Sequence, residues 1–273
     1  MEFFDTHCHI QESGDVTEAE TDPTRKRWLK NGNMLPQELI ERARNVGVTR
    51  LMAVGCTLED SKKAVILASH QPKVWASIGI HPHEAQKHLD NPRWLAQFTV
   101  LVADKNVVAI GECGLDYYYE NSPKDAQAQI LRFQLELAQK HNLPVIFHVR
   151  DAFDDFWPIL EEFNGIRGVI HSFTATEAEL QPVLAHGLYV GLNGIMTFTN
   201  DSAQLQAAKA VPLERMVLET DAPYLTPKAV RGNICEPQHV RLTAQFLAEL
   251  RGDTIDNLAN ATTRNARQLF STE

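Results

Sequence analysis

Eight short apolar runs recur along the chain, and a segment with helical features follows each of them. The runs are nearly continuous in apolar residues, which is typical of parallel strands buried on both faces. They cover residues 3–10, 50–56, 74–82, 107–117, 144–150, 167–173, 188–194 and 216–224. Eight strands that alternate with helices predict an α/β protein, a single (β/α)8 TIM-like barrel.

The segments between the runs carry the signals of helix starts and stops. Pro36 stands at a first helical position and Gly47 follows the same segment as a stop. Further helices are expected over about 59–70, 91–104, 124–142, 153–164, 176–186, 201–210, 236–251 and 254–270. We find no linker and no low-complexity segment, so we expect one domain over residues 1–273. An open doubly wound sheet would need a glycine-rich phosphate loop after its first strand, but that strand ends in histidines.

Charge and cysteine usage limit the class of protein. The 26 Lys and Arg against 35 Asp and Glu give a formal net charge of −9, so a polyanionic substrate needs a local binding site. Cys8, Cys56, Cys113 and Cys235 are scattered without a CxxC pair, which favours a reducing compartment. The first residues, MEFFDTHCHI, lack the features of a signal peptide, and charges interrupt every apolar run. We expect a cytoplasmic protein without membrane contact.

Two histidines mark the end of the first predicted strand. In a strand, alternate side chains share a face, so His7 and His9 in DTHCHI point the same way. A lone histidine in an apolar run is commonly a hydrogen-bonded core residue. A pair on one face at a strand end can instead bind one metal ion.

Other strands end in polar residues of the same kinds. These residues are His81, His83, Glu112, Asp116, His148, Arg150, His171, Glu219 and Asp221. The C-terminal ends of barrel strands converge, so residues far apart in the sequence become neighbours there. Polar groups in apolar strands are costly as isolated core residues. The pattern therefore predicts a metal site at the C-terminal ends of the strands.

Imidazoles combined with carboxylates suit divalent cations such as Zn, Mn, Fe, Co or Ni, and this many ligands can hold two ions. Glu112 is a candidate bridge between two ions, because its strand lies opposite the first. Asp221, which ends the strand beside the first, is placed to bind one ion and to accept a proton from an attacking water. Hydrolysis is the natural chemistry of such a site.

Six motifs occur in one order along nearly the whole chain: DTHCHI, GIHPH, GECGLDYY, PVIFHVRDA, HSFT and ETDAPYL. In these motifs the chain resembles the TatD-type metal-dependent deoxyribonucleases of the amidohydrolase superfamily. The resemblance implies a TIM-like barrel and divalent metal cofactors, Mg included, with Glu112 bridging two ions. The implied ligands are His7, His9, Glu112, His148, His171 and Asp221. The chain departs from the family pattern at RGNICEP, where Cys235 stands in place of the usual Asn.

The same resemblance implies that His81 and Arg150 line the substrate pocket, and that Glu219 lies behind a ligand or contacts substrate. It also implies metal-dependent cleavage of DNA phosphodiester bonds, although some relatives are linked to the removal of D-amino acids from tRNA.

Three functions remain open at this stage. The first is a deoxyribonuclease that uses a metal-activated water. The second is a hydrolase of the same fold that acts on an ester or amide, such as a misacylated tRNA or a small molecule. The third is a metal-binding scaffold without catalysis. The charge of −9 favours action on a DNA strand end or a short oligonucleotide, and no obligate protein partner is indicated.

Several neighbouring residues have less specific expectations. Cys8 and Cys113 alternate to the opposite strand face, which predicts small core residues. Asp5 lies deeper than His7 and favours a hydrogen-bonding role beneath the metal. His83 is open between substrate binding and exposure to solvent, and tyrosines 117–119 between base stacking and covering the barrel rim.

The first loop, about 11–35, carries an acidic stretch before a basic one. The acidic residues are Glu12, Asp15, Glu18, Glu20 and Asp22, and the basic ones are Arg25, Lys26, Arg27 and Lys30. One interpretation is an exposed insertion in which Trp28 packs against neighbouring helices. The other is a lid over the metal site, in which the cations bind phosphates and Trp28 stacks on a base.

Overall fold

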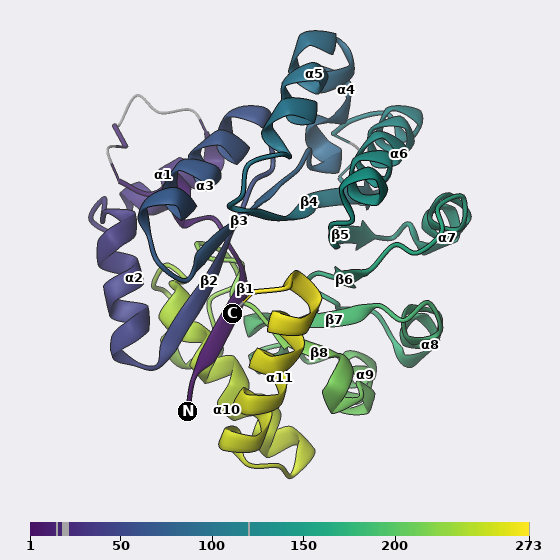
Figure 1. Cartoon of the computed structure of the whole chain (residues 1–273). Coiled ribbons are helices and arrows are strands. Elements are labelled where there is room, and N and C mark those ends of the chain that lie inside the picture. Colours follow the sequence, from purple (N-terminus) through teal and green to yellow (C-terminus); the bar gives the residue numbers. More distant parts are fainter. Residues whose placement is uncertain (15, 18–21, 120, 273) are drawn as a thin grey trace. The chain divides into compact units, whose positions relative to one another are not determined.

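The computed structural model describes residues 1–14, 16–17, 22–119 and 121–272 (Figure 1). Within this part of the chain, eight strands form one parallel sheet in the order β1 to β8, and helices follow each strand, which confirms the predicted (β/α)8 fold. The strands are β1 (Phe3–Cys8), β2 (Val48–Val54), β3 (Val74–Ile78), β4 (Val107–Asp116), β5 (Val145–Arg150), β6 (Gly168–Ile170), β7 (Tyr189–Leu192) and β8 (Met216–Leu218). The longer helices are α2 (Pro36–Asn45), α3 (Leu58–His70), α5 (Pro92–Leu101), α6 (Lys124–His141), α7 (Phe153–Glu161), α8 (Glu177–Ala185), α9 (Ser202–Ala210), α10 (Val240–Arg251) and α11 (Ile255–Phe270).

The chain is organised in two compact units. One consists of residues 1–53 and 172–268, and the other of residues 54–171 and 269–273. The expectation of one domain over residues 1–273 stays a prediction. Within the described residues, no helix combines the length and the apolar character needed to cross a membrane.

The first unit joins the first and last strands of the sheet. β1 pairs in parallel with β2, and β7 with β8. Just beyond β8, the backbone N–H of Asp221 donates to the carbonyl of His7 at 2.8 Å, and the N–H of His9 donates to the carbonyl of Ala222 at 2.8 Å. These bonds make β1 the neighbour of the β8 segment, as a (β/α)8 barrel requires. They also fix the two histidines beside Asp221.

The second unit contains β3, β4, β5 and β6, which pair in parallel in that order. Gly114 of β4 lies opposite His148 of β5 at a close backbone approach. Its φ of 153° falls where side chains are disfavoured, and an added Cβ would overlap the carbonyl of His148. Glycine at this position therefore lets β4 approach the part of β5 that carries His148.

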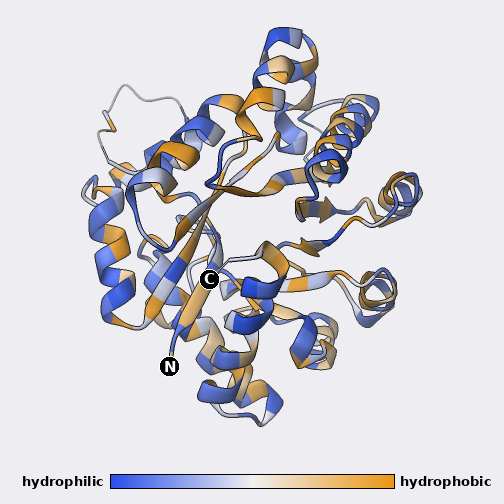
Figure 2. Cartoon of the chain, in the orientation of Figure 1, coloured by the Kyte–Doolittle hydropathy of each residue, from blue (hydrophilic) through white to orange (hydrophobic). Residues whose placement is uncertain are grey.

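The helices follow the local signals in the sequence. Pro36 occupies the first turn of α2, and the Glu38 carboxylate accepts a hydrogen bond from the N–H of Leu35 at 2.7 Å. The longest helix, α6, buries Ile130, Leu131 and other apolar residues while charged residues remain exposed. Figure 2 shows this as alternating polar and apolar colours along α6. Such amphipathic helices cover a sheet with one face.

Two short helices were not expected from the sequence: α1 (Pro23–Leu29) and α4 (Ala85–Leu89). Helix α1 lies inside the 11–35 segment. It begins where the Asp22 carboxylate accepts the N–H of Arg25 at 2.9 Å, with Pro23 at the first helical position. The remaining acidic residues of the segment, Asp15, Glu18 and Glu20, lie outside the described residues.

Candidate metal centre

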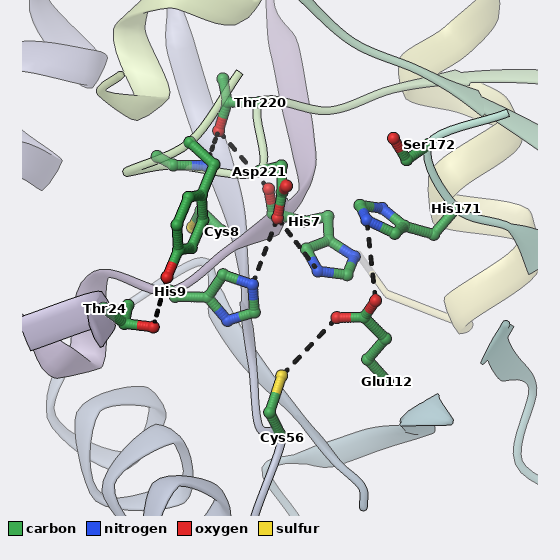
Figure 3. Close-up of polar contacts among 12 residues, drawn as sticks. His7, Cys8, His9, Thr24, Cys56, Glu112, His171, Ser172, Thr220 and Asp221 are labelled. Carbon is green, nitrogen blue, oxygen red and sulfur yellow. Dashed lines mark hydrogen bonds and ion pairs between the residues drawn. The ribbon is translucent and has the colours of Figure 1, made fainter. Parts of the chain in front are cut away.

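In the first unit, the ends of β1 and β8 bring together His7, His9 and Asp221 (Figure 3). The Asp221 Oδ1 atom lies 3.3 Å from His9 Nε2 and 3.7 Å from His7 Nε2. Ligand atoms bound to one metal ion at about 2.0–2.2 Å lie roughly 3.0–3.6 Å apart. Both histidines are buried. The spacing of the three donor atoms fits one divalent cation.

A buried carboxylate supports this cluster from below. Asp5 accepts hydrogen bonds from the backbone N–H of Thr220 at 2.8 Å and from its hydroxyl at 2.7 Å. Burial raises the pKa of Asp5 to about 8, against the lowering effect of these bonds. The carboxyl therefore ties β1 to the segment that carries Asp221, the hydrogen-bonding role expected for it.

Helix α1 packs beside the same cluster. The Trp28 ring is 0% exposed, and its Nε1 donates to the carbonyl of His9 at 3.1 Å. Packing of Trp28 is thus confirmed, and its predicted stacking on a base is wrong because the ring has no exposed face. The centre of the Tyr224 ring lies 6.5 Å from the centre of the His9 ring. The Tyr224 hydroxyl lies 2.8 Å from Thr24 Oγ1, and the Arg27 guanidinium lies 4.7 Å from the centre of the Tyr224 ring.

In the second unit, side chains from four strand ends surround the carboxylate of Glu112. Its Oε1 lies 2.7 Å from His148 Nδ1, 3.7 Å from His81 Nε2 and 3.8 Å from His171 Nε2. Its Oε2 lies 3.6 Å from the sulfur of Cys56, a contact drawn in Figure 3. The predicted convergence of Glu112, His148 and His171 at the C-terminal strand ends is therefore seen within this unit.

A second carboxylate orients His148 from its other side. Asp116 Oδ2 lies 3.0 Å from His148 Nε2 and 3.0 Å from His83 Nε2. Burial acts to raise the pKa of Asp116, but the hydrogen bonds from both imidazoles outweigh it and hold that pKa well below its usual range. The ionised carboxylate of Asp116 accepts a hydrogen bond from His148, so Nε2 of His148 carries a proton. The other ring nitrogen of His148, Nδ1, faces Glu112.

The close approach of His148 and Glu112 requires a positive charge between them. Without a second ring proton, the Nδ1 lone pair would face a carboxylate oxygen at 2.7 Å. Burial acts to lower the pKa of His148, yet its bonds with Asp116 and Glu112 raise that pKa above the ordinary value. Either a proton or a metal cation meets this requirement, so the donor set fits a divalent ion.

His81 has a different protonation pattern. Its Nδ1 accepts a hydrogen bond from the backbone N–H of His83 at 3.2 Å. Burial holds the pKa of His81 well below its usual range, against the opposing effect of Glu112, so the ring is neutral. A neutral imidazole that accepts at Nδ1 carries its proton on Nε2, the atom nearer Glu112. His81 is thus a hydrogen-bond donor at the edge of this cluster.

The other two expected substrate residues differ in exposure. Arg150 ends β5 in an exposed position, where its guanidinium lies 4.2 Å from the ring centre of Tyr118. Glu219 is buried and accepts hydrogen bonds from the backbone N–H of Ser172 at 2.6 Å and from Asn193 Nδ2 at 3.3 Å. The Glu219 carboxylate braces the segment after β6, and its contact with substrate stays a prediction.

The cysteines divide as their positions in the strands indicate. Cys8 and Cys113 are fully buried, as expected for core residues, and the Cys8 thiol lies 3.3 Å from the carbonyl of Met52. Cys235 is also buried, with its sulfur 3.9 Å from the carbonyl of Thr220. Sequence reasoning missed the contact of Cys56 with Glu112, although Cys56 ends the second predicted strand at the same side of the sheet.

The sequence matches a known protein family over nearly its whole length. The family described as TatD related DNase matches residues 4–271. The chain belongs to the TatD family. A Bacillus subtilis TatD relative, the uncharacterized metal-dependent hydrolase YabD, is 35% identical over 269 residues, which cover 98% of each chain. The 3'-5' ssDNA/RNA exonuclease TatD of Escherichia coli K12 is 35% identical over 246 residues, or 85% of this chain and 92% of the relative.

Solved structures of TatD proteins share the fold. The TatD homologue YjjV of Escherichia coli superposes with a TM-score of 0.84 at 27% identity, over 99% of this chain and 98% of the homologue. A TatD-family hydrolase of Entamoeba histolytica reaches a TM-score of 0.84 at 23% identity, over 99% of each chain. The chain is therefore a metal-dependent hydrolase of the TatD family, and the interpretation as a scaffold without catalysis is set aside.

Proposed function

We propose that this TatD-family hydrolase is a deoxyribonuclease that cleaves phosphodiester bonds at the end of single-stranded DNA. The observation that carries the proposal is the contact between Glu112 and His148, whose carboxylate oxygen and Nδ1 lie 2.7 Å apart, a spacing that either a proton or a metal cation between them satisfies. Support also comes from relatives named as 3'-5' ssDNA/RNA exonucleases. A net charge of −9 fits a substrate held locally at a strand end better than a long duplex.

The proposed metal ligands are the six residues expected from the sequence, and together they would hold two divalent cations. They are His7, His9, Glu112, His148, His171 and Asp221. In the first unit, His7, His9 and Asp221 have donor atoms spaced for one cation, and in the second unit Glu112 faces His148 and His171, at the C-terminal ends of strands of the same sheet. Glu112 would hold a cation together with His148 and His171, because its carboxylate faces both imidazoles, and its bridging of two ions stays a prediction. Divalent cations supply Lewis acidity, which polarises a phosphodiester and makes water more acidic.

Residues of the chain supply the other functions. Asp221 keeps a partly exposed carboxylate and is the proposed acceptor of the proton from the attacking water. His81, with its proton on Nε2, donates a hydrogen bond to a phosphodiester oxygen. Arg150 is the exposed cation that binds an adjacent phosphate, since its guanidinium suits phosphate geometry. Glu219 acts indirectly, because its carboxylate accepts the backbone N–H of Ser172.

A substrate panel tests the proposal against its alternative. Metal-reconstituted protein is incubated with single-stranded DNA, duplex DNA, aminoacyl-tRNA and bis(p-nitrophenyl) phosphate. We expect divalent-metal-dependent shortening of single-stranded DNA from one end. Release of amino acid from tRNA without shortening of any nucleic acid would overturn the nuclease assignment and favour the ester or amide hydrolase.

A further inference from the structure

Two adjacent tyrosines expose their rings next to the second cluster. Tyr118 is 59% exposed and Tyr119 54% exposed, which places them among the few large apolar side chains in the described part of the chain that face solvent. Their ring centres lie 4.8 Å apart, and the planes meet at 87°. Apolar side chains that gather on a surface are typical of ligand and macromolecule binding sites, so this adjacent pair is a candidate contact.

One carboxylate fixes the pair relative to a proposed metal ligand. Asp116 Oδ1 accepts the backbone N–H groups of Tyr118 at 3.0 Å and of Tyr119 at 3.1 Å. The other oxygen of the same carboxylate binds His148 and His83. The Tyr119 ring also lies 5.6 Å from the His83 ring. The backbone of the tyrosine pair is therefore held in place beside His148 before any substrate binds.

The charges around the pair are suited to a nucleotide. The Arg150 guanidinium lies 4.2 Å from the ring centre of Tyr118 and 4.8 Å from that of Tyr119. The Lys124 ammonium lies 3.9 Å from the ring centre of Tyr117, whose hydroxyl donates to Asp155. Two cations thus lie among three consecutive aromatic rings in a protein that is acidic overall. A nucleotide offers a flat base to such rings and a phosphate to such cations.

We propose that Tyr118 and Tyr119 form a platform for an unpaired nucleobase, in which one ring stacks on the base and the other, at 87° to it, contacts the base edge, with Arg150 on the adjacent phosphate. The inference rests on the proposed nuclease function and assigns side chains that would bind its single-stranded substrate. A base inside a duplex is already stacked and presents no free face to the tyrosines. The platform accepts any base, because stacking uses the π-face that all bases share. Its anchor on Asp116 places the bound nucleotide beside His148.

Binding without turnover tests the platform directly. A fluorescein-labelled oligothymidylate is titrated with protein in the presence of a chelator, and its anisotropy gives the Kd. The double variant Tyr118→Ala/Tyr119→Ala should raise the Kd by about 5- to 150-fold, the range for loss of one stacked base. The matched variant Tyr118→Phe/Tyr119→Phe keeps both rings and should bind within about twofold of the unchanged protein. Equal Kd values for the alanine variant and the unchanged protein would overturn the proposal.

An abasic probe separates stacking from a general effect on the surface. An oligonucleotide that lacks bases near its 3' end should bind the unchanged protein more weakly than the intact probe. The alanine variant should bind both probes alike, because it has no ring for the missing bases to contact. If the alanine substitutions raise the Kd of both probes by the same factor, so that the intact probe still binds better than the abasic probe, the tyrosines act structurally and the platform is refuted. Unfolding midpoints of all variants show whether each protein remains folded.

This design separates the platform from the nuclease function on which it rests. A protein whose affinity depends on the bases and the rings, but which shortens no DNA after metal is restored, keeps the platform and loses the nuclease assignment. A protein that shortens DNA with no dependence on the rings keeps the nuclease assignment and loses the platform.

Discussion

Replacement of Asp116 by Asn tests whether the orientation of His148 controls metal binding. The carboxylate of Asp116 accepts four hydrogen bonds: two from backbone N–H groups at Tyr118 and Tyr119, and two from the imidazoles of His148 and His83. Asparagine keeps one accepting oxygen and replaces the other with an N–H₂ group. Either the two backbone N–H groups or the two imidazoles then face a donor instead of an acceptor. Loss of the partner behind a metal-ligating imidazole costs about 10- to 100-fold in metal affinity, or about 1.4–2.7 kcal/mol.

The assay is a competition titration of Co²⁺ or Zn²⁺ between the protein and a chelator of known affinity. Asp155→Asn is the matched control, because Asp155 accepts a hydrogen bond from Tyr117 in the same tyrosine run but lies at the surface. We expect weaker metal binding in Asp116→Asn and unchanged binding in Asp155→Asn. Unchanged metal affinity in a folded Asp116→Asn protein would refute the reasoning about His148.

Three further changes test separate parts of the account. Asp221→Asn should lower kcat about 10²- to 10⁴-fold, as loss of a general base does, and near-normal turnover would assign the proton to another group. Replacing Arg25, Lys26 and Arg27 together by Ala should raise the KM for an oligonucleotide and flatten its salt dependence. Equal kinetic effects on an oligonucleotide and on a small phosphodiester would leave α1 a purely structural role. Burial lowers the pKa of His88, although the hydrogen bond of its ring to a backbone carbonyl opposes this. As the pH drops through about 6.5, the unfolded chain therefore binds a proton at His88 before the folded protein does, and the free energy of unfolding falls. His88→Gln should reduce that slope in denaturant titrations, and an unchanged slope would exclude His88 as its source.

The positions of the strands could be predicted because buried parallel strands are apolar along their whole length. The ends of the strands were less predictable. The run predicted over 216–224 ends as a strand at Leu218, because the chain turns at Asp221, where φ is 60°. The run predicted over 74–82 likewise ends at Ile78. In both places the motif continues into a loop that carries site residues, and side-chain apolarity does not report where the hydrogen-bond ladder stops.

Helix α1 could not be predicted from the sequence as the strands could. Its seven residues are too few for a clear hydrophobic period, and only the cap at Asp22 and Pro23 indicates its start. The two interpretations of Trp28 differ in a tertiary contact, the bond from its ring to the carbonyl of His9. No local pattern encodes that contact.

The candidate site residues are predicted from polar groups at the ends of apolar strands. Their individual roles depend on side-chain directions that strand periodicity does not determine. Asp116 was recognised as one of the converging residues, but its position behind His148 was not. The protonation of His81 depends on a backbone N–H two residues away, and the contact of Cys56 is with a side chain 56 residues further along the chain.

In the proposed mechanism, hydrolysis depends on divalent metal held by the strand-end ligands. The most direct measurement is hydrolysis of a single-stranded oligonucleotide by protein shown to be metal-free by elemental analysis, before and after addition of one divalent cation. We expect no hydrolysis without metal, recovery when the cation is restored, and an unchanged circular dichroism spectrum throughout, because a core of this size does not need the metal to fold. Full activity in the metal-free protein would contradict the account.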